Sequence, residues 1–172
     1  MKVCVIGCGG HANAMLGPSY KKYRALHPQA ELSACCDASP DAAAAFADKF
    51  GFIRTYENYT EMLINEKPDA VGIAVPVQLT QTITEQVMKL GYSCIIEKPP
   101  AMTASGVRSL VRVEKECGVQ LRVAFNRRFM PVIRVLKEQF ALRAEPMRYL
   151  CYDMQRVGRF DEDFTTTALY RE

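Results

Sequence analysis

A glycine-rich turn directly after a short apolar run is the feature that most constrains the fold of this chain. The apolar run Lys2–Ile6 predicts a strand, and the turn after it reads Gly7-Cys8-Gly9-Gly10-His11-Ala12. The turn matches the pattern G-x-G-x-x-G/A, in which Gly7 allows a tight bend, Gly9 lets the backbone approach a diphosphate and a small Ala12 lets the next helix pack on the strand. The N-terminus of that helix would favour the anion. Five residues are therefore expected to bind a dinucleotide: Gly7, Gly9, Gly10, His11 and Ala12.

Strand and helix patterns alternate along residues 1–125. The expected strands are Lys2–Ile6, Glu31–Cys36, Arg54–Tyr56, Asp69–Val75, Tyr92–Ile96 and Val119–Phe125. The expected helices are Gly10–Leu26, Pro40–Phe50 with Ser39 as cap and Gly51 as stop, Tyr59–Glu66, Leu79–Leu90, and a helix from its cap Thr103 to Cys117. This alternation predicts an α/β fold with a doubly wound parallel sheet of the Rossmann type and helices on both faces. Pro18 either kinks the first helix or marks its true start.

The pattern changes after Phe125. Phe129–Phe140 predicts a helix and Met147–Met154 predicts one strand, which cannot form an independent sheet. We therefore expect a dinucleotide-binding domain over residues 1–125, and over residues 126–172 the beginning of a second α/β domain that is incomplete in this chain.

Composition excludes several classes of protein. The 172 residues are 49% hydrophobic and 24% charged, and no stretch approaches the roughly 20 apolar residues of a membrane helix. The first strand begins where a signal peptide would have its apolar core, so a cytoplasmic location is expected. The net charge of +3 comes without a dense basic run, which argues against nucleic-acid binding. Seven cysteines without a CxxC pair and only two histidines predict buried thiols and no metal site.

Asp37 directly follows the second expected strand, at the edge where a parallel sheet binds its ligands. A carboxylate at this position accepts hydrogen bonds from the adenosine ribose and repels a 2′-phosphate. The next four residues include no lysine or arginine, so the sequence favours NAD over NADP as cofactor. The alternative is that Asp37 only caps the following helix.

Further polar residues follow the later strands at the same edge. Glu97-Lys98-Pro99-Pro100 puts an amine after the fifth strand, where Lys98 could hold an oxygen of a molecule beside the nucleotide, and one X-Pro bond there could be cis. A solvated lysine is the alternative. Pro76 either forms a floor for the nicotinamide or only ends its strand. Asn126 and Arg127 follow the sixth strand and either contact substrate or brace the domain junction.

Together these stretches resemble the Gfo/Idh/MocA family of NAD(P)-dependent oxidoreductases. The matching stretches are Val5 to Gly10, Asp37, Lys67 to Val71, Glu97-Lys98-Pro99 and Ala124 to Phe129. The resemblance implies a Rossmann domain followed by a domain with an open sheet that binds a sugar or polyol and often mediates homo-oligomers. We expect Pro76, Glu97 and Lys98 at the cofactor, and Lys98, Asn126 and Arg127 at the substrate.

The chain departs from the family at two places. Gln78 to Gln81 occupy the stretch after Pro76 where a histidine is often found, and Tyr170 stands near the position of the usual catalytic histidine. We expect an oxidoreductase that transfers a hydride between NAD(P) and a hydroxyl or carbonyl carbon, with Lys98 and Tyr170 as catalytic residues. The alternative is a non-catalytic NAD-binding module or sensor, which a coding sequence that continues past Glu172 would argue against.

Overall fold

The computed structural model describes residues 1–142. The chain divides into two compact units, Met1–Asn126 and Arg127–Glu172, one residue away from the expected boundary. The expected strand Met147–Met154 and the candidate base Tyr170 lie outside the described residues. None of the helices within the described range is long and apolar enough to cross a bilayer.

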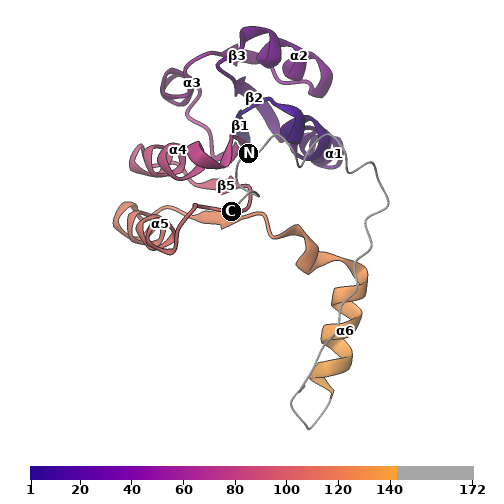
Figure 1. The fold of residues 1–172 in the computed structure, drawn as a ribbon. Coiled ribbons are helices and arrows are strands. Elements are labelled where there is room, and N and C mark those ends of the chain that lie inside the picture. Colours follow the sequence, from indigo (N-terminus) through magenta and orange to yellow (C-terminus); the bar gives the residue numbers. More distant parts are fainter. Residues whose placement is uncertain (143–172) are drawn as a thin grey trace, which may run out of the picture. The chain divides into compact units, whose positions relative to one another are not determined.

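The first unit is built on one parallel sheet (Figure 1). Its six strands lie in the order β3-β2-β1-β4-β5-β6, so the chain runs outward from β1 in one direction and then from β4 in the other. The strands are β1 (Lys2–Ile6), β2 (Glu31–Cys36), β3 (Arg54–Tyr56), β4 (Ala70–Ile73), β5 (Cys94–Ile96) and β6 (Leu121–Val123). This confirms the predicted doubly wound sheet, and its switch point lies between β1 and β4.

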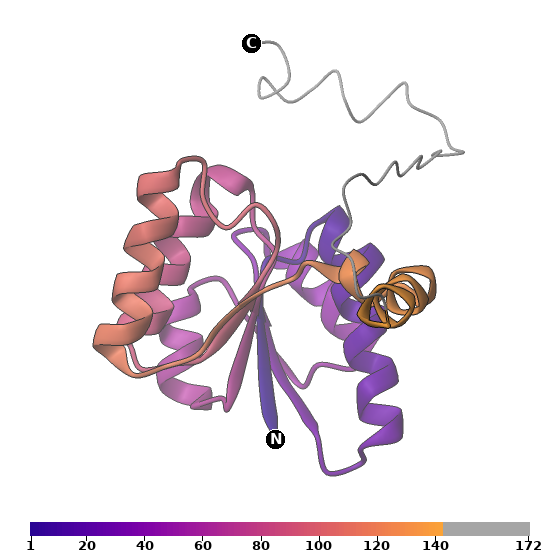
Figure 2. The same ribbon diagram turned by 90° about the horizontal axis from the view of Figure 1, so that it is seen from below.

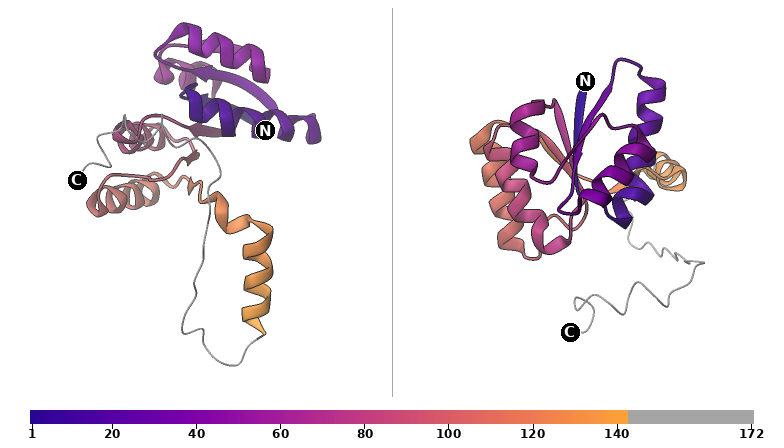
Figure 3. Two further views of the ribbon diagram at one scale, coloured as in Figure 1. Left: turned by 45° about the vertical axis from the view of Figure 1, so that its right-hand side comes forward. Right: turned by 90° about the horizontal axis from the view of Figure 1, so that it is seen from above.

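Helices cover both faces of the sheet (Figures 2 and 3). They are α1 (Gly17–Leu26) and α2 (Pro40–Phe50) on one face, and α3 (Tyr59–Glu66), α4 (Val77–Lys89) and α5 (Ala104–Cys117) on the other. The alternation of β1 explains the two cores. Val3 and Val5 pack with α2, whereas Cys4 and Ile6 pack with α3, α4 and α5.

Local sequence signals fix the ends of the helices. Ser39 caps α2 by accepting a hydrogen bond from the Ala42 N–H at 3.3 Å, and Thr103 caps α5 by accepting one from the Gly106 N–H at 3.1 Å. Gly51 ends α2 in the left-handed conformation with φ 83°. These caps and this stop were predicted by the sequence, and the structure confirms them.

The first helix differs from the uniform helix that the sequence predicts. Ala12–Leu16 form a π-helical turn, in which the Gly17 N–H bonds to the Ala12 carbonyl, and α1 begins only at Gly17. Pro18 therefore lies just after this π-helical turn, inside a helical stretch that is continuous from Gly10 to Leu26, so the helix lacks one backbone donor at this point. Close packing also fixes this point of the chain, because a Cβ on Gly17 would lie 2.3 Å from the ring of Phe50.

Other element boundaries moved by a few residues. α4 begins at Val77, two residues earlier than expected, because the Leu79 N–H already bonds to the Pro76 carbonyl at 2.8 Å. The helix expected over Phe129–Phe140 is present, but it begins two residues later than predicted. A 3-10 turn (Asn126–Phe129) is followed by α6 (Pro131–Ala141), because Met130 precedes a proline and takes an extended conformation.

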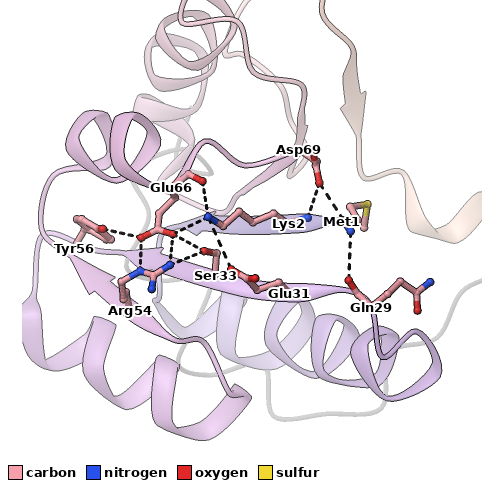
Figure 4. A network of polar contacts seen from close by, with 9 residues as sticks. All are labelled: Met1, Lys2, Gln29, Glu31, Ser33, Arg54, Tyr56, Glu66 and Asp69. Carbon is pink, nitrogen blue, oxygen red and sulfur yellow. Dashed lines mark hydrogen bonds and ion pairs between the residues drawn. The ribbon is translucent and has the colours of Figure 1, made fainter.

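A polar network links β1, β2 and β3 to the end of α3 (Figure 4). At its centre, the carboxylate of Glu66 is only 3% exposed. It accepts hydrogen bonds from Arg54 Nη2 at 2.6 Å, Tyr56 Oη at 2.7 Å and Ser33 Oγ at 2.5 Å. Lys2 Nζ lies 3.4 Å from the same carboxylate. Four side chains from three strands thus converge on the end of α3.

A bulge in the sheet explains how Ser33 reaches this network. The pairing of β1 with β2 runs from Val3–Leu32 to Cys4–Ala34, so Ser33 has no partner of its own in this register. Its hydroxyl is fully buried and bonds to Glu66. The hydrogen bonds from Arg54, then Ser33 and Tyr56, hold the pKa of Glu66 well below its ordinary value of 4.5.

Candidate functional site

Two adjoining cavities lie over the carboxyl ends of the strands, at the switch point of the sheet. The first has a volume of about 330 Å³ and is lined by Gly9, Gly10, His11, Ala74, Val75, Pro76, Val77, Thr80, Glu97 and Lys98. The second, of about 490 Å³, is lined by Ile6, Gly7, Gly9, Cys36, Asp37, Ala38, Glu57, Tyr59, Ala74, Val75, Pro76, Leu79 and Ile83. Because Gly9 and Ala74 to Pro76 line both, an extended ligand can occupy the two together.

The glycine turn forms the shared wall of the cavities. Gly7 has φ 92°, and a Cβ there would lie 2.2 Å from the carbonyl oxygen of Ala74, so only glycine fits between β1 and β4. Gly9 and Gly10 face open space, since a Cβ on either would meet no atom within 4 Å. A backbone left this open at the start of a helix fits a diphosphate.

Asn13 holds the glycine turn in place, a role that the sequence pattern did not reveal. Its Nδ2 donates to the carbonyl oxygens of Cys8 at 2.8 Å and Gly9 at 3.2 Å. The carbonyl groups of the turn are therefore directed toward the helix. This leaves the opposite side of the turn, with its N–H groups, for an anion.

Asp37 braces the same turn from the end of β2. Its Oδ2 accepts a hydrogen bond from the Cys8 N–H at 2.7 Å, and its Oδ1 accepts one from the Ser39 N–H at 3.0 Å. The cap of α2 is Ser39, so the alternative in which Asp37 only caps this helix is wrong. Each carboxylate oxygen has a second lone pair, which can accept a hydrogen bond from a hydroxyl of a ligand in the second cavity.

Lys98 lies on the first cavity together with Gly9 and Gly10, as its position after the fifth strand led us to expect. The preceding residue, Glu97, faces His11 across this cavity, with 3.2 Å between Glu97 Oε1 and His11 Nε2. The side chain of Glu97 is 13% exposed and that of His11 is 53% exposed. The Lys98–Pro99 peptide bond is cis. The cavity thus combines an open backbone turn, a carboxylate and an amine.

Several predicted site residues lie elsewhere. Ala12 is fully buried in the core between α2 and the sheet, where its small size matters for packing, and it lines neither cavity, so its expected cofactor contact stays a prediction. Asn126 is exposed and is not among the residues that line the two cavities. Arg127 begins the second unit. Substrate contacts of Asn126 and Arg127, like the role of Tyr170, stay predictions.

The wall of the second cavity contains residues that sequence reasoning missed. Tyr59 of α3 and Leu79 and Ile83 of α4 supply an apolar surface, and Leu79 is 50% exposed without a ligand. Glu57 adds a second carboxylate beside that of Asp37. One signal could have found Glu57: it follows the third strand directly, as Asp37 follows the second.

Two cysteines lie close to the cavities: Cys8 belongs to the glycine turn and Cys36 lines the second cavity. A hydrogen bond with Cys35, together with burial, raises the pKa of Cys8, and burial raises the pKa of Cys36 to about 12. Both thiols therefore stay protonated near neutral pH. Within residues 1–142, no three histidine, cysteine, aspartate or glutamate side chains gather as a metal site.

Comparison with known proteins gives consistent relatives. The family described as "Oxidoreductase family, NAD-binding Rossmann fold" matches residues 1–125. A D-glucoside 3-dehydrogenase of Escherichia coli is 30% identical over 139 residues, which cover 81% of this chain and 38% of the relative. Among solved structures, a dehydrogenase from Chromobacterium violaceum superposes with a TM-score of 0.74 at 26% identity and covers 83% of this chain.

A further solved structure carries a bound dinucleotide. The 3-ketoreductase KijD10 from Actinomadura kijaniata, in complex with NADP and TDP-benzene, superposes with a TM-score of 0.73 at 25% identity. The match covers 82% of this chain and 42% of KijD10, and the match to the C. violaceum dehydrogenase covers 40% of that protein. The chain thus spans about two fifths of the length of the relatives it matches.

Proposed function

The chain belongs to the Gfo/Idh/MocA oxidoreductase family, and on this premise we propose that it binds a nicotinamide dinucleotide as the cofactor-binding part of a sugar or polyol dehydrogenase or reductase. The observation that carries the proposal is the pair of adjoining cavities, which bring the open glycine turn, Asp37 and Lys98 to one edge of the sheet. The D-glucoside 3-dehydrogenase relative supports the class of substrate.

The described residues suit the parts of a dinucleotide in order. The apolar wall of the second cavity, with Leu79 and Ile83, would take the adenine, and the carboxylate of Asp37 would accept the hydrogen bonds of its ribose. The diphosphate would lie on the open backbone of Gly9 and Gly10. When bound, the nicotinamide supplies the site that accepts or gives a hydride.

We infer that Lys98 holds the reacting oxygen of the substrate. Lys98 lines the first cavity together with Gly9 and Gly10, so its ammonium group can donate a hydrogen bond to a hydroxyl or carbonyl oxygen bound there and stabilise negative charge that develops on it. Such preorganised donors contribute about 3–4 kcal/mol to transition-state stabilisation. The contact between Glu97 and His11 holds the segment before Lys98 at the edge of this cavity.

The cofactor is proposed to be NAD rather than NADP. Asp37 and Glu57 bring two carboxylates to the second cavity, and none of its lining residues is a lysine, arginine or histidine. A 2′-phosphate would meet like charges there without a cation to offset them. Self-association and a cytoplasmic location stay predictions of the sequence.

Titration of the chain with NADH tests the proposal. The two readouts are the fluorescence of the NADH nicotinamide and the thermal unfolding of the chain, which contains no tryptophan. A ligand at 100 times its dissociation constant adds about 2.7 kcal/mol to the free energy of unfolding, so the melting temperature should rise clearly. S-adenosylmethionine serves as the control ligand, since it shares the adenosine but lacks a diphosphate. A chain that responds to S-adenosylmethionine and to neither dinucleotide would contradict the proposal.

The role of Lys98 requires a second experiment. Lys98→Ala should leave the affinity for NADH within about twofold, because the glycine turn and Asp37 bind the cofactor without it. In a form of the protein that turns over a polyol, the same change should lower kcat by about 10²-fold or more. Unchanged turnover would remove Lys98 from the mechanism, and NADH binding without any turnover of polyols or sugars would favour a non-catalytic module.

A further inference from the structure

Two acidic residues end neighbouring strands and face the same cavity. Asp37 follows β2 and Glu57 follows β3, and the two strands pair as far as Cys36 and Tyr56. The Asp37 N–H continues this ladder by donating to the Tyr56 carbonyl at 3.2 Å. Both side chains line the second cavity. The sheet itself therefore fixes the two carboxylates side by side.

The two carboxylates differ in burial and in hydrogen bonding. Asp37 is half-buried and accepts hydrogen bonds from two backbone N–H groups, whereas Glu57 is exposed. The basic residue of the same strand, Arg54, is held at the opposite end by Glu66, with 2.6 Å between Arg54 Nη2 and Glu66 Oε2. Within the described part of the chain, no cation lines this cavity to offset the charge of Glu57.

The charge of Glu57 reaches the end of β2. Burial raises the pKa of the Cys36 thiol to about 12, and the negative charges of Asp37 and Glu57 act in the same direction. Cys36 lies on the floor of the cavity, next to Asp37. A phosphate bound at this point would experience both charges.

We propose that Glu57 is a second selectivity residue, which acts with Asp37 to exclude the 2′-phosphate of NADP. The inference rests on the proposed function, because it assumes that the ribose lies beside Asp37. In this proposal the two residues have different roles. The carboxylate of Asp37 is held by the glycine turn and the loop before α2, whereas the exposed carboxylate of Glu57 acts only through its charge.

This division has a consequence for changing the cofactor. Asp37→Asn removes one charge but disturbs the bracing of Cys8 and Ser39, and the charge of Glu57 still opposes the phosphate. Glu57→Gln removes the charge of a side chain that makes no hydrogen bond within the described residues. Glu57→Gln should therefore strengthen NADPH binding without loosening the glycine turn, whereas Asp37→Asn should change both.

The test is a titration of wild type, Glu57→Gln and Glu61→Gln with NADH and with NADPH. Glu61 is the matched control, since it is also an exposed acid of the same segment but lines neither cavity. Glu57→Gln should tighten NADPH by about tenfold, the effect of one exposed unit charge on a nearby dianion in water. It should leave NADH within about twofold, and Glu61→Gln should change neither ligand.

Salt separates a charge effect from a steric one. At 1 M salt the screening length is about 3 Å. The dissociation constants of Glu57→Gln and wild type for NADPH should therefore become nearly equal. If wild type binds NADH and Glu57→Gln leaves NADPH unchanged, or tightens both ligands equally, this inference is wrong while the proposed function stands. If wild type binds neither dinucleotide, both fail.

Discussion

Replacing Glu66 by glutamine should destabilise the sheet more than any other single loss of charge in the first unit. Glutamine has the same shape, but its amide nitrogen cannot accept a hydrogen bond. Glu66 accepts bonds from Ser33, Arg54 and Tyr56 and lies 3.4 Å from the amine of Lys2. At least one donor therefore loses its acceptor, and two cations lose their counter-charge.

The magnitude follows from burial. Removing one partner of a buried ion pair costs about 3–5 kcal/mol. Arg54 is 48% exposed and can return partly to water, so the cost should fall below this range and we expect about 2–3 kcal/mol. For a unit of this size, at about 2.1 cal/mol/K of unfolding entropy per residue, the melting temperature should fall by about 10 °C.

The pH dependence provides a second measurement on the same variant. The pKa of Glu66 is lowered in the folded state, so its contribution is fully present above its ordinary value of 4.5 and is lost as the pH falls below that value. The stability gap between wild type and Glu66→Gln should narrow by up to about 1.4 kcal/mol per pH unit below pH 4.5.

Urea unfolding followed by circular dichroism at pH 7 and pH 3.5 is a suitable assay. Glu116→Gln is the control, since Glu116 is 65% exposed and lies 3.9 Å from Arg112 one turn away. Its loss should cost less than about 0.5 kcal/mol. Equal losses in the two variants, or a gap for Glu66→Gln that stays constant with pH, would refute the reasoning.

Three other changes test the fold around the site. Gly7→Ala should cost about 3 kcal/mol or more and weaken NADH binding, because its Cβ would lie 2.2 Å from the Ala74 oxygen at φ 92°; wild-type stability in urea would contradict this. Asn58→Ala should cost about 1 kcal/mol, since Asn58 caps α3 through the Thr60 N–H at 2.8 Å, and Asn58→Asp should retain most of that stability. Burial raises the pKa of Tyr20 to about 12, so ultraviolet titration to pH 11 should give the same phenolate absorbance for wild type and Tyr20→Phe.

The parts of the fold that depend on local sequence were predictable. The bounds of β1, β2 and β3 agree with the strands predicted from the sequence, and Ser39, Thr103 and Gly51 act where their backbone preferences place them. The π-helical turn before Gly17 was not predictable. It ends at Gly17, which packs closely against Phe50 of a different helix, and the local sequence does not contain that contact.

Some residues of the candidate site were likewise predictable from the sequence, and others were not. The glycine turn, Asp37 and Lys98 could be found because each directly follows a strand, and parallel strands share one ligand edge. Glu57 was missed although it directly follows a strand, because that strand is only three residues long and its place beside β2 is a property of the whole sheet. Asn13 was missed because its partners are backbone carbonyls rather than residues of a recognisable motif.

The two ends of the sheet carry separate tasks. The ion pairs of Glu66 with Lys2 and Arg54 stabilise the starts of β1 and β3. Glu57 and Lys98 follow the carboxyl ends of β3 and β5 and are not members of this network. Natural variation can therefore exchange the exposed side chains of one rim and leave the anchoring rim intact. Descendants of such a chain could acquire new ligand preferences through small steps, each of which leaves the molecule folded.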